Sequence, residues 1–157
     1  MFILPVARYF GEDETDGRSV LWQRSANPAR NKMAPRLLVI DDDRSTALIV
    51  ARIAETIGFA VKTITDPFVA LEAFLEFEPD VVFLDMIMPE KDGIDVLQEI
   101  LLAGASGRIV LSSAFGRGYL FQATELARFH DKTDVVVLNK PFRREELVEA
   151  LQGPNRT

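Results

Sequence analysis

The chain contains no cysteine and only one histidine, His130, among its 157 residues. Without cysteine there can be no disulfide bond, thiolate zinc site or cysteine nucleophile, and the composition fits a reducing compartment. No apolar run approaches the roughly 18 uninterrupted residues of a membrane span. The first residues, Met1 to Arg8, lack the basic lead of a signal peptide. We therefore expect a cytoplasmic protein that does not insert into a membrane.

Positive charge is also scarce, with 18 Lys and Arg against 24 Asp and Glu and a formal net charge of −6. Nonspecific binding to nucleic acid depends on cationic side chains that neutralise phosphates, so this balance argues against direct nucleic-acid binding. Hydrophobic residues make up 48% of the chain and charged residues 27%, which is typical of a soluble globular protein of one domain.

The first part of the chain differs from the rest. Residues 1–35 show no sustained hydrophobic period and include an acidic, turn-like stretch at 11–17 and a polar stretch interrupted by Pro28. Such a segment is typical of a poorly ordered extension, although a partner-binding arm is an alternative. We expect an N-terminal extension over 1–35, one domain over 36–152 and a tail over 153–157.

From Arg36 onward, short apolar runs alternate with segments of helical period. We expect helices that begin at a Ser45 or Thr46 cap, at Asp66-Pro67, near Ile94, near Gly118 and after Phe142. The expected strands are 37–40, 59–64, 81–84, 109–112 and 135–138. Five strand–helix repeats predict an α/β fold with a parallel sheet and helices on both faces.

Charged residues come directly after three of these strands. Asp41 and Asp42 follow the first strand, Asp85 follows the third and Lys140 follows the fifth. Because the carboxyl ends of parallel strands meet at one edge, where open α/β sheets bind ligands, we expect these side chains to converge.

Converging carboxylates require compensation. Two charges about 4 Å apart repel by about 4 kcal/mol at an effective dielectric of about 20, so the group must take up protons or hold a cation. Oxygen ligands without histidine or cysteine favour Mg2+ or Mn2+. The sequence therefore predicts a metal site at Asp41, Asp42 and Asp85. Asp43 is a fourth candidate that could equally cap the following helix.

A carboxylate can also attack phosphorus and form an aspartyl phosphate. Asp85 suits this role because it ends a central strand, and Lys140 would supply a positive charge to a phosphoryl oxygen. Ser113 offers a hydroxyl at the end of the fourth strand, and the strand register favours it over Ser112.

Four motifs together resemble the receiver domain of two-component response regulators. They are LLVIDDD at 37–43, VFLDMIMP at 82–89 followed by Asp92-Gly93, LSSA at 111–114 and NKPF at 139–142. The resemblance implies a flavodoxin-like, doubly wound fold with five parallel strands in the order 2-1-3-4-5. It also implies a phosphoacceptor rather than an enzyme.

The resemblance assigns a role to each residue at the edge. Asp85 would accept phosphate from a phosphohistidine on a sensor kinase or phosphotransfer protein. Asp41, Asp42 and Asp85 would hold Mg2+ together with the backbone carbonyl of Ile87. Ser113 would turn toward the phosphoryl group and Lys140 would pair with it. Since only six residues follow Leu151, we expect a single-domain regulator that signals by binding an unknown downstream protein.

Three features depart from the family pattern. Val137 stands where many members have an aromatic residue, so rotation of a Tyr or Phe cannot be the readout. The 27 positions from Ser113 to Lys140 suggest a longer fourth helix or a longer loop. Ile87 is apolar where a polar side chain could steer an attacking water, so we expect slow loss of phosphate.

Two other readings are open. Asp41-Asp42-Asp43-Arg44-Ser45 superficially fits the opening motif of haloacid-dehalogenase phosphatases, with Asp41 as nucleophile, but this leaves Asp85 and Lys140 unexplained. Alternatively, the chain could be a receiver-like binding module that is never phosphorylated.

Overall fold

The computed structural model describes residues 33–114, 117–128, 130 and 133–153. The extension expected over 1–35 and the tail expected over 153–157 therefore lie almost wholly outside the described residues. Among the residues that are described, no helix combines the length and apolarity needed to cross a bilayer.

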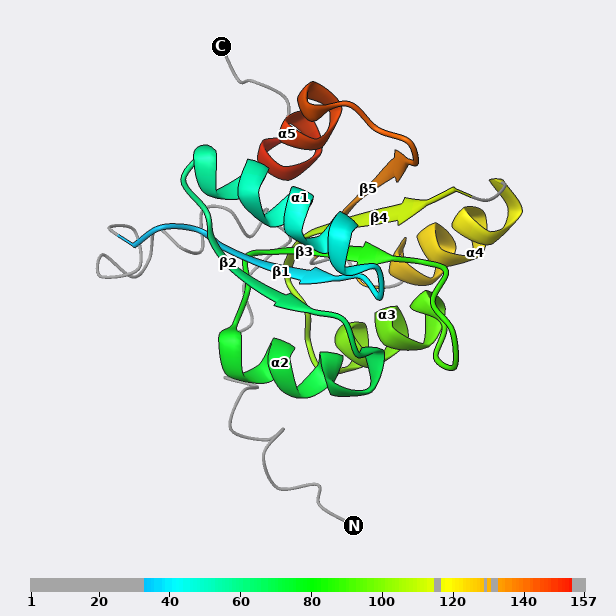
Figure 1. The fold of residues 1–157 in the computed structure, drawn as a ribbon. Helices are drawn as coiled ribbons and strands as arrows, with labels where there is room; N and C mark the ends of the chain where they lie inside the picture. The colour runs from blue at the N-terminus through cyan, green and yellow to red at the C-terminus, as the bar shows by residue number, and fades with distance from the viewer. Residues whose placement is uncertain (1–32, 115–116, 129, 131–132, 154–157) are drawn as a thin grey trace.

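The centre of the fold is a sheet of five parallel strands in the order β2-β1-β3-β4-β5, as Figure 1 shows. This order confirms the predicted fold class. The strands are β1 (Arg36–Ile40), β2 (Ala60–Ile64), β3 (Val81–Asp85), β4 (Gly107–Ser113) and β5 (Thr133–Asn139). The two last strands begin about two residues earlier than their apolar runs, because Gly107 and Thr133 already pair across the ladder.

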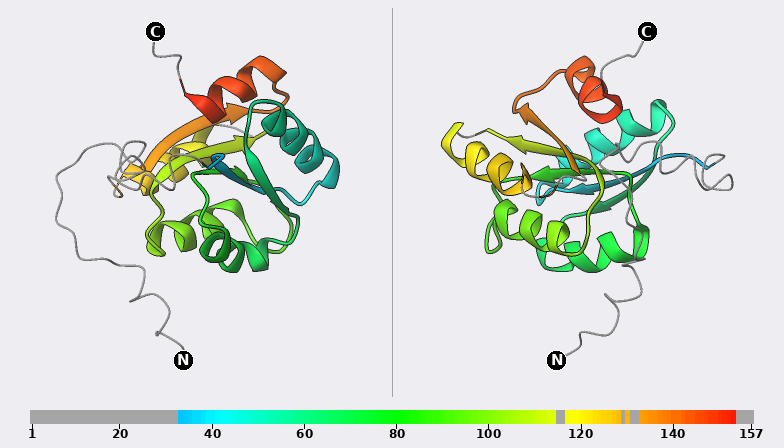
Figure 2. Two further views of the ribbon diagram at one scale, coloured as in Figure 1. Left: turned by 90° about the vertical axis from the view of Figure 1, so that its left-hand side faces the viewer. Right: turned by 180° about the vertical axis from the view of Figure 1, so that it is seen from behind.

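The helices lie in two layers, one on each face of the sheet (Figures 1 and 2). Residues of α1 and α5 pack on one face, and residues of α2, α3 and α4 pack on the other. The helices are α1 (Arg44–Thr56), α2 (Ala70–Phe77), α3 (Gly93–Leu102), α4 (Arg117–Arg128) and α5 (Arg144–Gln152), and a 3-10 turn, η3 (Pro67–Val69), leads into α2.

Helix α1 begins two or three residues earlier than a cap at Ser45 or Thr46 would give. Asp43, rather than Ser45 or Thr46, is the N-cap: its carboxylate accepts the Ser45 amide at 3.0 Å and the Thr46 hydroxyl at 2.7 Å. An aspartate before a helix accepts these bonds with little rearrangement. The expected cap at Ser45 or Thr46 was therefore wrong, whereas the alternative that Asp43 caps this helix is confirmed. Asp66 caps η3 as expected, with Pro67 at the first position.

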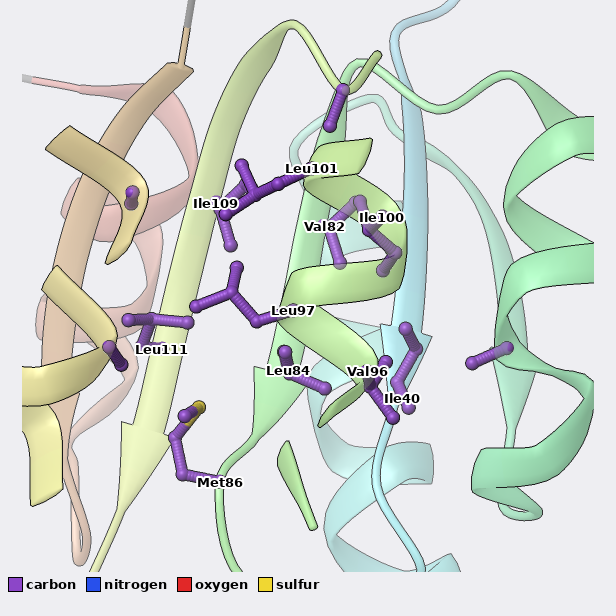
Figure 3. Close-up of a cluster of buried hydrophobic side chains, with 14 of the residues drawn as sticks. Ile40, Val82, Leu84, Met86, Val96, Leu97, Ile100, Leu101, Ile109 and Leu111 are labelled. Carbon is purple, nitrogen blue, oxygen red and sulfur yellow. The ribbon is translucent and has the colours of Figure 1, made fainter. Parts of the chain in front are cut away.

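Side chains that alternate along the strands build two cores. Figure 3 shows the larger one, where Ile40, Val82 and Leu111 meet Leu97 and Ile100 of α3. The second core joins the alternate strand residues to α1 and α5. Because β3 is buried along its whole length, it can carry a charge only at its end. In α2, Ala70 and Ala73 pack in the core, whereas Leu71 is only half-buried.

Two arginines close helix ends at the edge of the sheet opposite the strand tips. Arg36 donates to the carbonyl oxygen of Phe77 at the end of α2, at 2.8 Å. Arg108 donates to the carbonyl oxygen of Ala150 in α5 at 3.0 Å and also pairs with Asp134. These bonds satisfy carbonyls that have no partner within their helices.

We expect Arg108→Met to lower the free energy of unfolding by about 1–3 kcal/mol, because the Ala150 carbonyl and the Asp134 carboxylate lose a charged donor. Urea denaturation of the purified variant measures this change. An unfolding midpoint equal to that of the wild type would show that the arginine does not hold α5 in place.

Candidate functional site

Three aspartates meet at the carboxyl edge of the sheet. Asp41 and Asp42 follow β1, and Asp85 ends β3, which lies next to β1 in the sheet. One carboxylate oxygen from each residue lies within 4.8 Å of the others. Asp41 is fully buried and Asp85 is 5% exposed, whereas Asp42 is exposed. The predicted convergence is therefore confirmed by the geometry.

Asp41 is buried with both carboxylate oxygens occupied. Oδ1 accepts the backbone amide of Asp43 at 2.9 Å, and Oδ2 accepts the ammonium of Lys140 at 3.1 Å. A buried carboxylate is tolerated only when it is paired and hydrogen-bonded in this way. Asp41 thus serves as the anchor of the group.

Lys140 supplies positive charge to the buried part of the group. Its side chain is 22% exposed, and its Nζ lies 3.1 Å from Asp41 Oδ2 and 3.4 Å from Asp85 Oδ1. Burial works to lower the pKa of Lys140, but the carboxylates of Asp85 and Asp41 outweigh it and raise the pKa above its ordinary value. Lys140 is therefore held as a cation.

Asp85 is the carboxylate of this group whose pKa is raised. Burial, together with the neighbouring Asp41 carboxylate, raises its pKa to about 6 even though Lys140 and the Ile87 amide act to lower it. The Ile87 amide donates to Asp85 Oδ1 at 3.3 Å. Among the described residues, the one ammonium of Lys140 faces three neighbouring carboxylates, which leaves a deficit of positive charge at the site. Its donors are all oxygen atoms, which fits a hard divalent cation.

Asp43 takes the role of helix cap rather than joining the three carboxylates. Its hydrogen bond from the Thr46 side chain, followed by that from the Ser45 amide, lowers its pKa below the ordinary value. It therefore stays ionised at the N-terminus of α1, where negative charge is favourable.

Ser112 and Ser113 end β4, and both are buried. Ser113 pairs with Asn139 of β5, and its carbonyl oxygen accepts the Lys140 amide at 3.0 Å. Ser112 is the ladder partner of Asp85. Within the part of the chain that the structure describes, the Ser112 hydroxyl has no hydrogen-bond partner.

The loop between β3 and α3 is fixed by contacts that the sequence pattern did not reveal. The Lys91 ammonium binds both Glu99 oxygens, at 2.7 and 2.8 Å, and lies 5.5 Å from the centre of the Phe68 ring. A Cβ on Gly93 would lie only 2.4 Å from the Met86 Cα. Lys91 and Glu99 are eight positions apart, more than the three or four that make side chains neighbours on a helix, so only the fold brings them together.

In metal-free protein, the raised pKa of Asp85 makes stability fall as pH rises from about 4 to about 6. The folded state keeps a proton there that the unfolded state has already released, so the ionised form is penalised on folding. Asp85→Asn removes this penalty, and we expect it to be about 2 kcal/mol more stable than the wild type above pH 6.

The measurement is urea denaturation in EDTA at several pH values. Near pH 4 the wild type and Asp85→Asn have similar stability, because both carry a neutral group. If the difference in unfolding free energy between the wild type and Asp85→Asn were the same at every pH, the effect would not come from ionisation of the Asp85 carboxyl group.

We expect Lys91→Met to cost about 1–2 kcal/mol of unfolding free energy, because Glu99 loses a cation whose side chain is only 13% exposed. Lys62→Met is the matched control, since Lys62 pairs with Glu76 at 3.6 Å on the surface. Thermal denaturation compares the two variants. Equal losses would show that Lys91 does no more than an ordinary surface lysine.

Comparison with known proteins agrees with this geometry. The sequence model of the protein family described as the response regulator receiver domain matches residues 37–152. The chemotaxis protein CheY of Thermotoga maritima is 32% identical over 120 residues, which cover 76% of this chain and 96% of that protein. CheY of Bacillus subtilis is 33% identical over 121 residues, with the same shares covered.

A solved structure shows the same arrangement of elements. The response regulator signal receiver domain from Bermanella marisrubri superposes with a TM-score of 0.64 at 28% identity, covering 74% of this chain and 94% of that one. The family match, the relatives and the acidic site with its lysine lead to one conclusion. This chain belongs to the response regulator receiver domains, which act in two-component signalling as phosphoacceptors rather than as enzymes.

Proposed function

We propose that Asp85 accepts a phosphoryl group from a phosphohistidine on a sensor histidine kinase or a histidine phosphotransfer protein. An Asp85 oxygen forms a bond to phosphorus while the bond from phosphorus to the imidazole nitrogen breaks, and the electron pair stays on that nitrogen. The observation that carries the proposal is Asp85 itself: a buried carboxylate at a strand end, beside Asp41 and 3.4 Å from the half-buried ammonium of Lys140.

The residues around Asp85 suit a Mg2+-dependent step, and Mn2+ would fit the same donors. Asp41, Asp42 and Asp85 would hold the ion together with the backbone carbonyl of Ile87. When bound, the ion neutralises charge on the phosphoryl oxygens. This assignment is supported by the oxygen-only donors and by the deficit of positive charge among the three carboxylates.

Two further residues would respond to the phosphoryl group. Lys140 would transfer its interaction from the Asp85 carboxylate to a phosphoryl oxygen, which carries more charge. Ser113 would turn toward the same group. Phosphorylation adds about −1.5 to −2 charges, enough to bias the end of β4 and the segment that follows it between two arrangements.

The output of this domain is contact with another protein. We propose that residues 36–152 work as one receiver domain that binds a downstream partner and makes no direct contact with nucleic acid or membrane. Val137 is 38% exposed on β5, where many receivers carry an aromatic residue. The partner would therefore read a surface that lacks the usual aromatic rotation.

The phosphatase alternative is less favourable. Its nucleophile would be Asp41, yet Asp41 is fully buried and both of its oxygens already accept hydrogen bonds. The contacts of Asp85 with the Ile87 amide and with Lys140 are longer, at 3.3 and 3.4 Å, and both involve Oδ1, and its pKa is raised. These differences favour Asp85 as the acceptor.

We expect incubation with acetyl phosphate and Mg2+ to add one phosphoryl group that alkali removes, because acyl phosphates hydrolyse readily. Intact-mass spectrometry detects the group, and reduction with borohydride followed by peptide mapping locates it. Asp85→Asn should abolish the modification, and EDTA should suppress it.

The same experiment separates the alternatives. A modification on Asp41 would support the phosphatase reading. An unmodified wild type would favour a binding module that is never phosphorylated.

We expect slow hydrolysis of the phosphorylated protein, because the Ile87 side chain, 43% exposed beside the site, cannot hold an attacking water. Ile87→Asn should shorten the lifetime several-fold by supplying a polar group, and Ile87→Leu is the apolar control. The decay of the phosphorylated species after removal of acetyl phosphate gives the rate. A wild-type half-life of seconds, or equal rates in all three proteins, would refute this role for Ile87.

A further inference from the structure

Ser112 occupies an unusual position for a hydroxyl group. Its side chain is fully buried, and its Oγ has no hydrogen-bond partner among the described residues. Its strand neighbour on the same face, Val110, belongs to the core formed with α1 and α5. Burying a hydroxyl without a partner costs about 1–3 kcal/mol, so the resting fold gains nothing from a serine here.

The register shows what lies beside this hydroxyl. Residues that pair in adjacent parallel strands are about 4.8 Å apart and face the same side. Ser112 pairs with Asp85 on one side and with Leu138 on the other. Phe83, Val110 and Leu138 all belong to the core on the α1 and α5 face, so strand alternation puts Asp85 and Ser112 on that face as well.

Lys140 reaches Asp85 across the strand that carries Ser112. Lys140 follows β5, Asp85 ends β3, and β4 lies between these two strands. The Lys140 ammonium nevertheless comes within 3.4 Å of Asp85. The ion pair therefore bridges the tip of β4, and Ser112 is the residue of β4 that pairs directly with Asp85.

From this arrangement we infer that the Ser112 hydroxyl forms a hydrogen bond within the site when Asp85 is phosphorylated. The hydroxyl finds its hydrogen-bond partner only when Asp85 carries a phosphoryl group, within the pair formed by that group and Lys140. A phosphoryl group on Asp85 adds three strong acceptor oxygens, one of which can accept a hydrogen bond from the Ser112 hydroxyl. The inference rests on the proposed function of Asp85, and it is separate from the role of Ser113, which lies one residue further along β4.

The test uses beryllium fluoride with Mg2+ as a mimic of the phosphoryl group. Ser112→Ala should leave the stability of the ligand-free protein equal to that of the wild type or higher, because it removes an unpartnered polar atom. The same variant should bind beryllium fluoride about tenfold more weakly, because one hydrogen bond to a charged group is lost. Calorimetry and urea denaturation give the two quantities.

A second pair of variants guards against effects of size. Ser112→Thr and Ser112→Val have nearly the same shape and differ in one hydroxyl. We expect the threonine variant to bind beryllium fluoride more tightly than the valine variant, while the valine variant is at least as stable without ligand. If the hydroxyl had only a structural role, the valine variant would be less stable than the threonine variant without ligand. The two variants would then bind beryllium fluoride equally well.

The outcomes distinguish this inference from the proposed function. If the wild type binds beryllium fluoride, Asp85→Asn does not, and Ser112→Ala matches the wild type, the role of Ser112 is refuted and the phosphoacceptor stands. If the wild type and Asp85→Asn both fail to bind, the proposed function and the inference fall together.

Discussion

The chemistry of the site depends on a charge imbalance that the fold imposes at one edge of its sheet. Asp41 and Asp85 are buried beside Asp42, and among the residues that the structure describes only Lys140 pairs with two of them. Carboxylates in such a position raise one another's pKa or attract a cation. The raised pKa of Asp85 and the raised pKa of Lys140 are two consequences of the same arrangement. The chemistry of a phosphoacceptor follows from this imbalance, since a divalent cation and a phosphoryl group together restore it.

The rest of the chain explains how such an edge can be stable. The two helical layers bury β1 and β3 along their length, so charge is confined to the strand ends. At the opposite edge, Arg36 and Arg108 bind the carbonyls that end α2 and α5. Around the site, Asp43 caps α1, and the contact between Lys91 and Glu99 holds the loop that follows Asp85. The repulsion between carboxylates at one edge is thus offset by the stabilising effect of packing and hydrogen bonds elsewhere in the fold.

Much of this could be predicted from the sequence because topology alone decides it. Once the apolar runs are recognised as parallel strands, the residues that follow them must share an edge, so Asp41, Asp42, Asp85 and Lys140 could be grouped without coordinates. The limits of the strands were less accurate, because backbone pairing in β4 and β5 already begins at Gly107 and Thr133, before the first apolar residue of each run. The cap of α1 was left undecided, because Asp43, Ser45 and Thr46 are all residues that can cap a helix, and Asp43 was also a possible metal ligand.

Other features could not be predicted because they depend on three-dimensional neighbours. The contact between Lys91 and Glu99 joins a loop to a helix across a spacing that no pattern describes. The Ser112 hydroxyl looks like an ordinary serine until the sheet shows that it is buried beside Asp85 without a partner. Pairing of strands gives positions, but the satisfaction of a polar group depends on every atom around it.

The most direct test of the charge imbalance is a carbon-detected NMR titration of the Asp85 carboxyl group, with and without Mg2+. Our account predicts a pKa of about 6 in metal-free protein and a clear fall in this pKa when Mg2+ is added, because the cation favours the ionised form. An ordinary aspartate pKa near 3.9 that does not respond to Mg2+ would contradict the account.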